Sequence, residues 1–452
     1  MFRKYRSVLS VIAVLTVSML CSCGKKENGT DQNNTRNTVH ITTQTEVAAS
    51  TTTESDITTS DTVSSDTGTT TEQTTTEEIT SENTEEAKPP FSDSIDVFTE
   101  DGSASAQFFA LDTLISIKVY GENSETVVKD IADLIDHMDG ILSTERTDSE
   151  LYRLNTTGKA ACSDDLLNTI TKAKQISTDT NGTFDVTVYP LVKLWGFTDL
   201  SEDAEHSMPS EEDIKSALAL LGSEDINIKE LPAGEWPNAY SDGYVSAGDT
   251  STQLFGIEYA KDGMAVDLSA IGKGYIGDKI SELLLSRKDE GLTGAVISLG
   301  GSVCLVGSKP DGSKWGVGIR DPRGSADQTI AVLSFEAQYG DDLSPISIST
   351  AGTYERYVEI DNYFYHHILD PKTGYPTETD LLSATVLTED GALADALSTA
   401  LVVMGCDKAI EFWRNGPYDF EMVLTGDDYS LYVTEGLKDI YSSSEQTEFI
   451  SR

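Results

Sequence analysis

The pattern of apolar and polar positions changes near residue 105 of the 452-residue chain. From there on, apolar residues recur with the periods of strands and helices. Alternating positions predict a strand over Phe108–Tyr120, and apolar residues spaced three and four apart predict a helix through residues 127–142. Ser163 is a typical N-cap residue and predicts the start of a second helix.

The rest of the chain continues this mixture of helical and strand patterns. Ser210 and Asp213 resemble a capping box that opens a helix ended by Gly222, and residues 226–265 look like an irregular insertion. Further expected elements are a helix over Ile271–Leu285, a buried strand over Ala295–Leu299, strands and hairpins over 314–369, and a buried apolar helix over 392–404. We therefore predict an α+β (mixed α/β) fold over residues 100–445, bilobed, with mixed sheets and surrounding helices.

The first residues have the features of a secretion signal. Three basic residues precede an apolar run, 8–20, which is too short for a comfortable membrane-spanning helix. The run ends in Leu20-Cys21-Ser22-Cys23, which resembles a bacterial lipobox with a small residue before the cleavage site. We expect a signal peptide over 1–22 and lipidation of Cys23, rather than an ordinary signal peptide with an incidental cysteine.

The segment that follows is strongly polar. In residues 41–90, 24 of 50 side chains are Ser or Thr and none is aromatic. Such a stretch cannot bury enough apolar area to offset the entropy lost on ordering. We expect a Ser/Thr/Glu-rich disordered tether over 23–95, which would hold an exported domain at the outer face of the bacterial cell membrane.

Charge and cysteine content exclude several classes of protein. The net charge is -44, which excludes a general nucleic-acid-binding surface. Residues 1–90 hold 7 basic and 13 acidic side chains, so residues 91–452 hold 25 and 63 and carry a net charge of -38. A solvated, salt-adapted surface and an attraction for divalent cations both fit this excess. The 5 cysteines are too few and too dispersed for a disulfide scaffold.

One helix carries a candidate metal site. Asp395 and Thr399 lie four residues apart in the apolar predicted helix, so their oxygens share a face. A carboxylate with a hydroxyl is a hard-oxygen pair suited to Mg²⁺. The spacing also fits a locally paired Asp and a Thr bonded back to a carbonyl. A carboxylate in so apolar a helix needs a partner, which favours a specific role.

A lysine and a histidine pair are further candidates. Lys273 lies between two glycines near a predicted helix start, where amides could approach a phosphate, although a surface Lys in a tight turn fits as well. The sequence has no Walker motif and no Gly-x-Gly-x-x-Gly motif. His366 and His367 lie on a predicted strand, where only one of them can face a cleft. That one could serve as a general base, or both could form a cross-strand packing pair.

A dense patch of turn, aromatic and acidic residues covers Gly182–Thr187, with Leu194–Phe197 close behind it. A turn glycine, an aromatic ring and a carboxylate could hold a planar ring with polar edges. The same residues also fit core aromatics beside an Asx turn. The pattern alone does not separate these interpretations.

Taken together, these segments resemble the FAD:protein FMN transferase (ApbE) family, from about Phe108 to Gly405. Each segment is weak alone, but seven in the family's order are specific. They are Ser149–Asn155, Thr180–Thr187, Asp267–Gly274, Leu299–Gly301, Trp315–Arg323, His367–Pro371 and Ala394–Leu401.

The resemblance implies a Mg²⁺-dependent enzyme that cleaves FAD. It attaches FMN through a phosphoester bond to a Thr or Ser hydroxyl of an exported acceptor protein and releases AMP. The resemblance also implies that Asp395, Thr399 and the carbonyl of Ala270 hold the metal and that His367 is catalytic. The positions expected to contact FAD are Leu111, Thr183, Phe184, Asp185, Asp267, Lys273 and Ile368. Lipoprotein forms are common in the family, which agrees with Cys23.

Three positions depart from the family's usual pattern. Leu111-Asp112 stands where Met-Gly is frequent, Glu145 where Tyr or Asn is frequent near the flavin, and Ala351 where Ser is frequent. Two alternatives therefore stay open: an FAD diphosphatase that gives FMN and AMP, and a non-catalytic flavin-binding lipoprotein. The chain has no acceptor segment such as Asp-x-x-Thr-Gly-Ala-Thr, so self-flavinylation is not expected.

Overall fold

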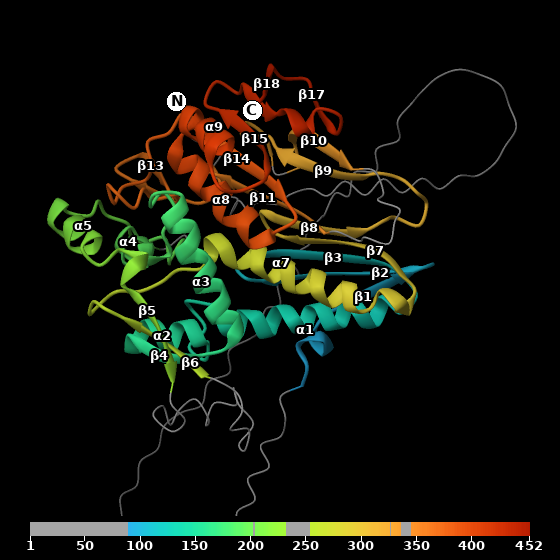
Figure 1. Cartoon of the computed structure of the whole chain (residues 1–452), viewed down its shortest axis with the longest axis horizontal. Helices are drawn as coiled ribbons and strands as arrows, with labels where there is room; N and C mark the ends of the chain where they lie inside the picture. Colours follow the sequence, from blue (N-terminus) through green and yellow to red (C-terminus); the bar gives the residue numbers. More distant parts are fainter. Residues whose placement is uncertain (1–88, 202–203, 232–253, 326, 336–344) are drawn as a thin grey trace, which may run out of the picture. The chain divides into compact units, whose positions relative to one another are not determined.

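A ten-stranded sheet is the frame of the computed structural model, which describes residues 89–201, 204–231, 254–325, 327–335 and 345–452 (Figure 1). All neighbouring strands are antiparallel except the last pair. In sheet order the strands are β1 (Val97–Glu100), β2 (Ser103–Ala110), β3 (Thr113–Gly121), β7 (Leu292–Leu299), β8 (Ser302–Gly307), β11 (Ile346–Gly352), β14 (Leu381–Thr388), β15 (Glu421–Gly426), β16 (Leu431–Thr434) and β18 (Thr447–Ile450).

Three smaller sheets accompany this frame. Two have three strands each, in the orders β4-β6-β5 and β17-β10-β9, and the third is the hairpin β12-β13. Their strands are β4 (Lys159–Cys162), β5 (Ile226–Leu231), β6 (Leu254–Tyr259), β9 (Trp315–Arg320), β10 (Thr329–Phe335), β12 (Tyr357–Ile360), β13 (Tyr363–His366) and β17 (Tyr441–Ser443).

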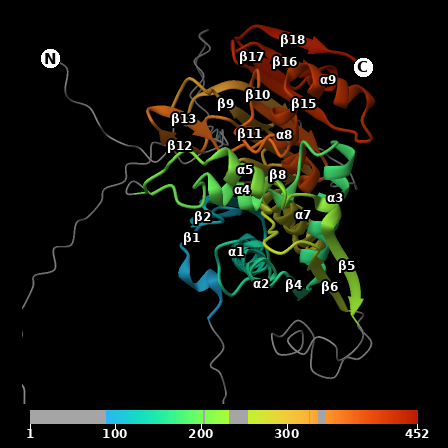
Figure 2. The same ribbon diagram turned by 90° about the vertical axis from the view of Figure 1, so that its left-hand side faces the viewer.

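Helices α1, α7 and α8 pack on one face of the large sheet and bury the main apolar core (Figure 1). A second apolar cluster joins α4, α5 and β12, and Figure 2 shows the hairpin beside these helices. The α-helices are α1 (Ser124–Leu142), α2 (Glu150–Thr157), α3 (Asp164–Asp179), α4 (Tyr189–Leu194), α5 (Glu211–Leu218), α7 (Ser269–Ser286), α8 (Gly391–Met404) and α9 (Cys406–Asn415). The predicted mixture of helices and mixed sheets is confirmed.

Several expected elements are found. The helices expected through 127–142, 271–285 and 392–404 are α1, α7 and α8. Ser163 accepts a hydrogen bond from the Leu166 amide, and Ser210 accepts one from the Asp213 amide, so both act as N-caps. Among the described residues, Cys162, Cys304 and Cys406 are buried and unpaired, as expected for a fold not defined by disulfides.

Two expectations are wrong. Phe108–Tyr120 is not one strand but parts of β2 and β3, joined by a tight turn at Leu111-Asp112 with φ of 53° and 54°. Positive φ at both turn residues is typical of a two-residue hairpin, but the glycine that usually marks it is absent. Residues 226–265 are not wholly irregular, because β5 and β6 pair there; residues 232–253 lie outside the described part.

The folded unit extends a little beyond the predicted bounds of 100 and 445. The 3₁₀ helix η1 (Phe91–Ser94) packs on α1, where the amide and hydroxyl of Ser92 donate to the carboxylate of Asp133 at 2.7 and 2.8 Å. At the other end, β18 pairs with β16. Residues 1–22, Cys23 and the tether up to residue 88 lie outside the described residues. Within the described residues, no helix is long and apolar enough to cross a membrane.

Candidate functional site

Asp395 is a buried carboxylate at the crossing of α7 and α8, with 5% of its surface exposed. Its Oδ2 accepts a hydrogen bond from the Gly274 amide at 3.0 Å. Its Oδ1 accepts from the hydroxyls of Ser302 on β8 and Ser349 on β11, at 3.2 and 3.0 Å. Gly274 packs directly on Gly391, and a Cβ at position 274 would overlap the Gly391 carbonyl. The partners that the apolar helix required for Asp395 are thus present.

The lysine expected to bind phosphate lies beside this carboxylate. Lys273 Nζ lies 3.9 Å from Asp395 Oδ2 and donates to the Ser269 carbonyl at 2.5 Å. In a regular helix the amide of residue 274 points to the carbonyl of residue 270, so Ala270 lies on the Asp395 side of α7. Thr399, half-buried, follows Asp395 by one turn of α8. The structure therefore places Lys273 beside Asp395, and the roles of Ala270 and Thr399 as metal ligands stay predictions.

A cluster of charged residues that the sequence did not indicate adjoins Lys273. Burial raises the pKa of Glu355 to about 7, against the opposing effect of Lys273, Arg320 and Arg356, and Asp395 raises it further. Arg320 packs over the Tyr354 ring, with Cζ 5.3 Å from the ring centroid. Its Nε and Nη1 are buried and have no hydrogen-bond partner among the described residues. In a strongly acidic protein, this is a local group of three cations.

His367 faces this cluster from the end of the β12–β13 hairpin. Its amide donates to the Arg356 carbonyl at 3.0 Å, and its Nδ1 lies 3.2 Å from the same oxygen. A carbonyl only accepts, so Nδ1 carries the proton and Nε2 holds the free electron pair. His367 is half-buried. Burial, with Arg356 beside it, lowers the pKa of His367 to about 3, so the ring is neutral.

The two histidines have different surroundings. His366 turns its Nε2 to the Thr377 carbonyl at 3.1 Å, and burial lowers its pKa. Ile368, the next residue after His367, is buried in the main core with 3% exposure. Only His367 therefore adjoins the charged cluster.

The polar side chains of the patch at 183–185 form hydrogen bonds with residues close in sequence. Thr183 Oγ1 donates to the Thr180 carbonyl at 3.1 Å, and Phe184 is buried in the main core. Asp185 Oδ1 accepts from the amide and hydroxyl of Thr187 at 2.9 and 2.7 Å, and burial raises the pKa of Asp185. This matches the interpretation of an aromatic beside an Asx turn. Contact of these residues with FAD stays a prediction.

Several acidic residues lie near Arg356 and near one another. The amide of Asp267 donates to the Val186 carbonyl at 2.8 Å, which places Asp267 beside the patch at 183–185. Arg356 Nη2 donates to the Asp112 carbonyl at 3.3 Å, which ties the turn holding Leu111 to the hairpin base. Burial raises the pKa of Glu145, and the charges of Asp112 and Asp267 raise it further. These acidic residues therefore share one electrostatic environment.

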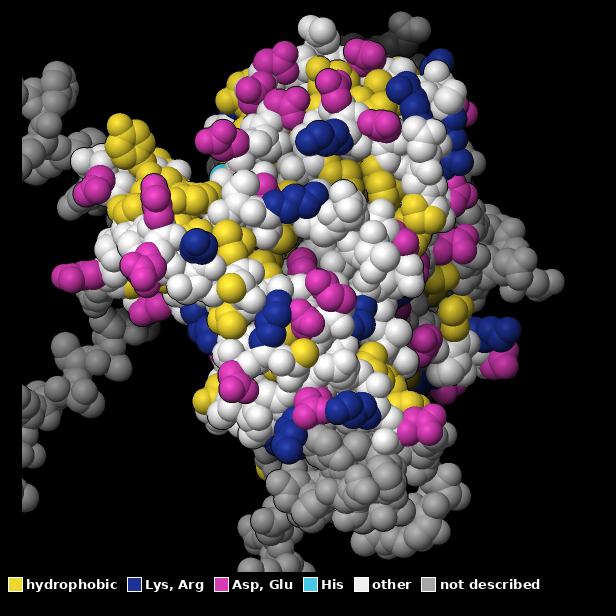
Figure 3. All heavy atoms as spheres, turned by 60° about the vertical axis from the view of Figure 1, so that its left-hand side comes forward, with side chains coloured by type: hydrophobic (Ala, Val, Ile, Leu, Met, Phe, Trp, Pro, Cys, Tyr) yellow, Lys and Arg dark blue, Asp and Glu magenta, His cyan; other side chains and the backbone are white. Residues whose placement is uncertain are grey.

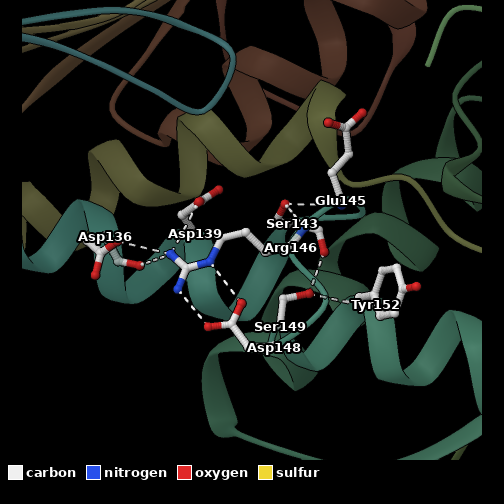
Figure 4. A network of polar contacts seen from close by, with 8 residues as sticks. All are labelled: Asp136, Asp139, Ser143, Glu145, Arg146, Asp148, Ser149 and Tyr152. Carbon is white, nitrogen blue, oxygen red and sulfur yellow. Dashed lines mark hydrogen bonds and ion pairs between the residues drawn. The ribbon is translucent and has the colours of Figure 1, made fainter. Parts of the chain in front are cut away.

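The neighbouring Arg146 explains why the Glu145 side chain points toward Asp112 and Asp267. Arg146 donates to the carboxylates of Asp136, Asp139 and Asp148 at 3.0–3.3 Å, and the Ser143 hydroxyl accepts from the amides of residues 145 and 146. Figure 4 shows the Glu145 side chain pointing away from this network. The connection between α1 and α2 is thus fixed by Arg146, and Glu145 is left to face the site.

Sequence reasoning missed several residues of the site. They are Ser302, Arg320, Ser349, Glu355 and Arg356. Ser302 and Ser349 are directly paired across β8 and β11, but only the sheet order shows this. A possible signal was the double Gly before Ser302, which marks a tight turn next to a candidate loop. For the three charged residues no sequence signal existed, because distant segments bring them together.

Comparison with known proteins identifies relatives over this whole region. Residues 111–424 match the model of the ApbE family. Proteins named FAD:protein FMN transferase from Vibrio cholerae and Treponema pallidum are 31% and 30% identical over 333 and 322 residues. These alignments cover 73% and 68% of this chain, and 86% and 80% of the relatives.

Solved structures agree with these sequence relatives. The ApbE protein from Thermotoga maritima superposes with a TM-score of 0.61 at 27% identity, covering 76% of this chain and 99% of that one. The flavin transferase ApbE from Vibrio cholerae gives a TM-score of 0.58 at 26% identity, covering 75% and 99%.

Proposed function

The chain belongs to the ApbE family and is an enzyme of the flavin transferase kind; on this premise we propose its specific reaction. It transfers FMN from FAD to a Thr or Ser hydroxyl of an exported acceptor protein through a phosphoester bond. AMP is released, and Mg²⁺ is required. The observation that carries the proposal is the buried Asp395 carboxylate, fixed by three hydrogen bonds, with Lys273 at 3.9 Å and His367 in the same charged cluster.

The donor atoms around Asp395 suit Mg²⁺. Asp395, Thr399 and the carbonyl of Ala270 offer hard oxygens from two crossing helices, which is the ligand chemistry that Mg²⁺ prefers. Within the described residues, no group of three or more His, Cys, Asp or Glu side chains could hold a metal ion. Mg²⁺ is usually held by one or two carboxylates together with substrate phosphates, so a site with the single carboxylate of Asp395 suits it. When bound, the ion supplies positive charge that stabilises the transferring phosphoryl group.

The protein's own cations would hold the anionic diphosphate of FAD. The folded part carries a net charge of -38, so FAD binds only where positive charge is concentrated. Lys273, Arg320 and Arg356 provide such a place. Arginine binds phosphate oxygens in a fixed fork, and the glycines beside Lys273 allow close approach.

His367 would take the proton of the acceptor hydroxyl at Nε2. The hydroxyl oxygen bonds to the FMN phosphorus, the diphosphate P–O bond breaks, and AMP leaves with the bonding electrons. With a pKa of about 3, His367 is a weak base in the free protein. Bound diphosphate would offset the charges of Arg356 and Lys273 and raise this pKa, so the base becomes effective only in the complex. General-base assistance of this kind contributes about 10²- to 10⁴-fold.

We also propose that the protein acts outside the cell, anchored by lipid on Cys23 at the outer face of the membrane. The basic start, the short apolar run and the lipobox-like Leu20–Cys23 support this proposal. The polar tether up to about residue 88 would give the domain reach to an exported acceptor. Metabolic labelling with a fatty-acid analogue should mark the wild type and leave Cys23→Ala unmarked; equal labelling of both would reject the anchor.

The reaction is tested by incubating the protein with FAD, Mg²⁺ and a soluble acceptor domain that carries Asp-x-x-Thr-Gly-Ala-Thr. We expect flavin fluorescence on the denatured acceptor, and its loss in Asp395→Ala and in His367→Ala. Intact labelling in both variants would refute the proposed site. Free FMN and AMP without labelling would indicate the diphosphatase, and FAD bound without turnover would indicate a binding protein.

A further inference from the structure

The outer face of the β12–β13 hairpin carries two exposed aromatic side chains. Tyr357 and Phe364 are 44% and 65% exposed. Their rings meet edge to face, with centroids 5.0 Å apart and planes at 86°. The register pairs Tyr357 with His366 and Glu359 with Phe364, so these residues share one face of the hairpin. We name Tyr357 and Phe364 the aromatic patch.

The opposite face fixes the hairpin to the domain. Val358 and Ile360 are buried in the second apolar cluster with Trp195, and the Tyr365 ring lies 5.4 Å from the Trp195 ring. The hairpin therefore has its packing without the aromatic patch. Isolated exposed apolar residues are common, but two aromatics in contact on a firmly held element form a contiguous surface that suits a partner.

The aromatic patch begins one residue from the hairpin base that holds the proposed catalytic residue; in the register, His366 and not His367 shares its face. The hairpin closes at its base where the Arg356 carbonyl accepts from the amide of His367, and Nδ1 of His367 is directed to the same oxygen. Tyr357 directly follows Arg356, and His366 directly precedes His367. A protein segment that delivers a hydroxyl to His367 would approach the hairpin base, where the strand that carries Tyr357 begins.

We propose that the aromatic patch binds the acceptor protein, through apolar side chains that neighbour its target Thr or Ser. This inference rests on the proposed function and adds the surface that selects the protein substrate. Figure 3, which brings this side forward, shows hydrophobic side chains exposed among acidic ones. With a net charge of -38 in the folded part, general electrostatic attraction would select only basic partners. Apolar contact with aromatic anchors gives affinity without that restriction.

The test replaces both aromatics, in Tyr357→Ser/Phe364→Ser, in the full chain. The matched control is Phe98→Ser, because Phe98 on β1 is also 65% exposed but lies at an edge of the large sheet. The probe is the soluble acceptor domain with Asp-x-x-Thr-Gly-Ala-Thr. Three quantities are measured: the KM for the acceptor, the Kd for FAD, and direct binding of an acceptor whose target Thr is changed to Ala.

We expect the double variant to raise the acceptor KM and the direct-binding Kd at least about tenfold, as for a lost aromatic anchor. Its kcat at saturating acceptor and its Kd for FAD should stay within about twofold of wild type. The Phe98→Ser control should match wild type in all measurements. An unchanged acceptor KM, or an equal rise in Phe98→Ser, would overturn the proposal.

Other outcomes separate this proposal from the proposed function. If the wild type transfers FMN and the double variant behaves the same, the acceptor-binding role of the aromatic patch is rejected and the transferase function stands. Patch-dependent binding of the probe without any transfer would reject the transferase and keep the patch. If sedimentation showed a dimer that the double variant dissociates, with an unchanged acceptor KM, the patch would be a contact between copies of this chain and the proposal would fall.

Discussion

Removing the Ser349 hydroxyl tests how much one hydrogen bond to the Asp395 carboxylate contributes, without changing any other residue of the site. Ser349 is 1% exposed, and its Oγ lies 3.0 Å from Asp395 Oδ1 and 2.9 Å from Ser302 Oγ. In Ser349→Ala, Oδ1 of Asp395 keeps only the longer contact from Ser302, at 3.2 Å. The fold loses no apolar contact, so the change reports on the polar network.

The expected decrease in the free energy of unfolding follows from the type of hydrogen bond removed. A hydrogen bond to a charged group contributes about 1.5–3 kcal/mol, and its loss here leaves a buried carboxylate under-solvated. Ser347→Ala is a matched control on the same strand and face, because Ser347 is 4% exposed and its Oγ has no hydrogen-bond partner among the described residues. Removing a hydroxyl without a partner should change stability by less than about 1 kcal/mol.

Urea unfolding followed by tryptophan fluorescence measures both variants. We expect the free energy of unfolding to fall by about 1.5–3 kcal/mol in Ser349→Ala and to stay near wild type in Ser347→Ala. We also expect Ser349→Ala alone to raise the Mg²⁺ concentration needed for half-maximal transfer, since Asp395 loses orientation. Equal effects in the two variants would refute the inferred support of Asp395.

Three further predictions concern charge. As pH rises through the Glu355 pKa of about 7, the new negative charge beside Lys273 should weaken FAD binding. In a fluorescence titration of FAD binding against pH, Glu355→Gln should remove this decrease in affinity. If the decrease persists, another group causes it. Burial raises the pKa of Asp278 from 3.8 to about 6, so the folded protein favours the neutral carboxyl. The free energy of unfolding should therefore fall by up to about 3 kcal/mol as pH rises from 4 to 6. In urea unfolding, Asp278→Asn should reduce this dependence on pH, and an unchanged dependence would contradict the assignment. Glu145→Gln should tighten FAD binding severalfold by removing a negative charge from the site, and a weaker complex would indicate that Glu145 contacts FAD favourably.

The elements that the sequence predicted well are those with a long local pattern. The apolar helix α8 showed where Asp395 and Thr399 lie, and the glycines around Lys273 marked the start of α7. The turn at Leu111-Asp112 was missed because the alternation continues through it and no glycine interrupts the pattern. Local patterns therefore located helices and caps better than turns between paired strands.

The charged half of the site depended on tertiary contacts. Glu355 and Arg356 lie between β11 and β12, in a stretch with no helical or strand period to give their direction. Arg320 ends β9, which belongs to a different sheet, and Ser302 meets Ser349 only because β8 pairs with β11. Such contacts between distant segments carry no periodic signal, so a single sequence does not predict them.

The stoichiometry of the products tests the central claim most directly. The protein is incubated with FAD, Mg²⁺ and the soluble acceptor domain, and AMP is quantified alongside the intact mass of the acceptor. The account predicts an acceptor heavier by one FMN through a phosphoester bond, one AMP for each modified acceptor, and neither product when Mg²⁺ is chelated. AMP and free FMN in equal amounts, with an acceptor of unchanged mass, would contradict it.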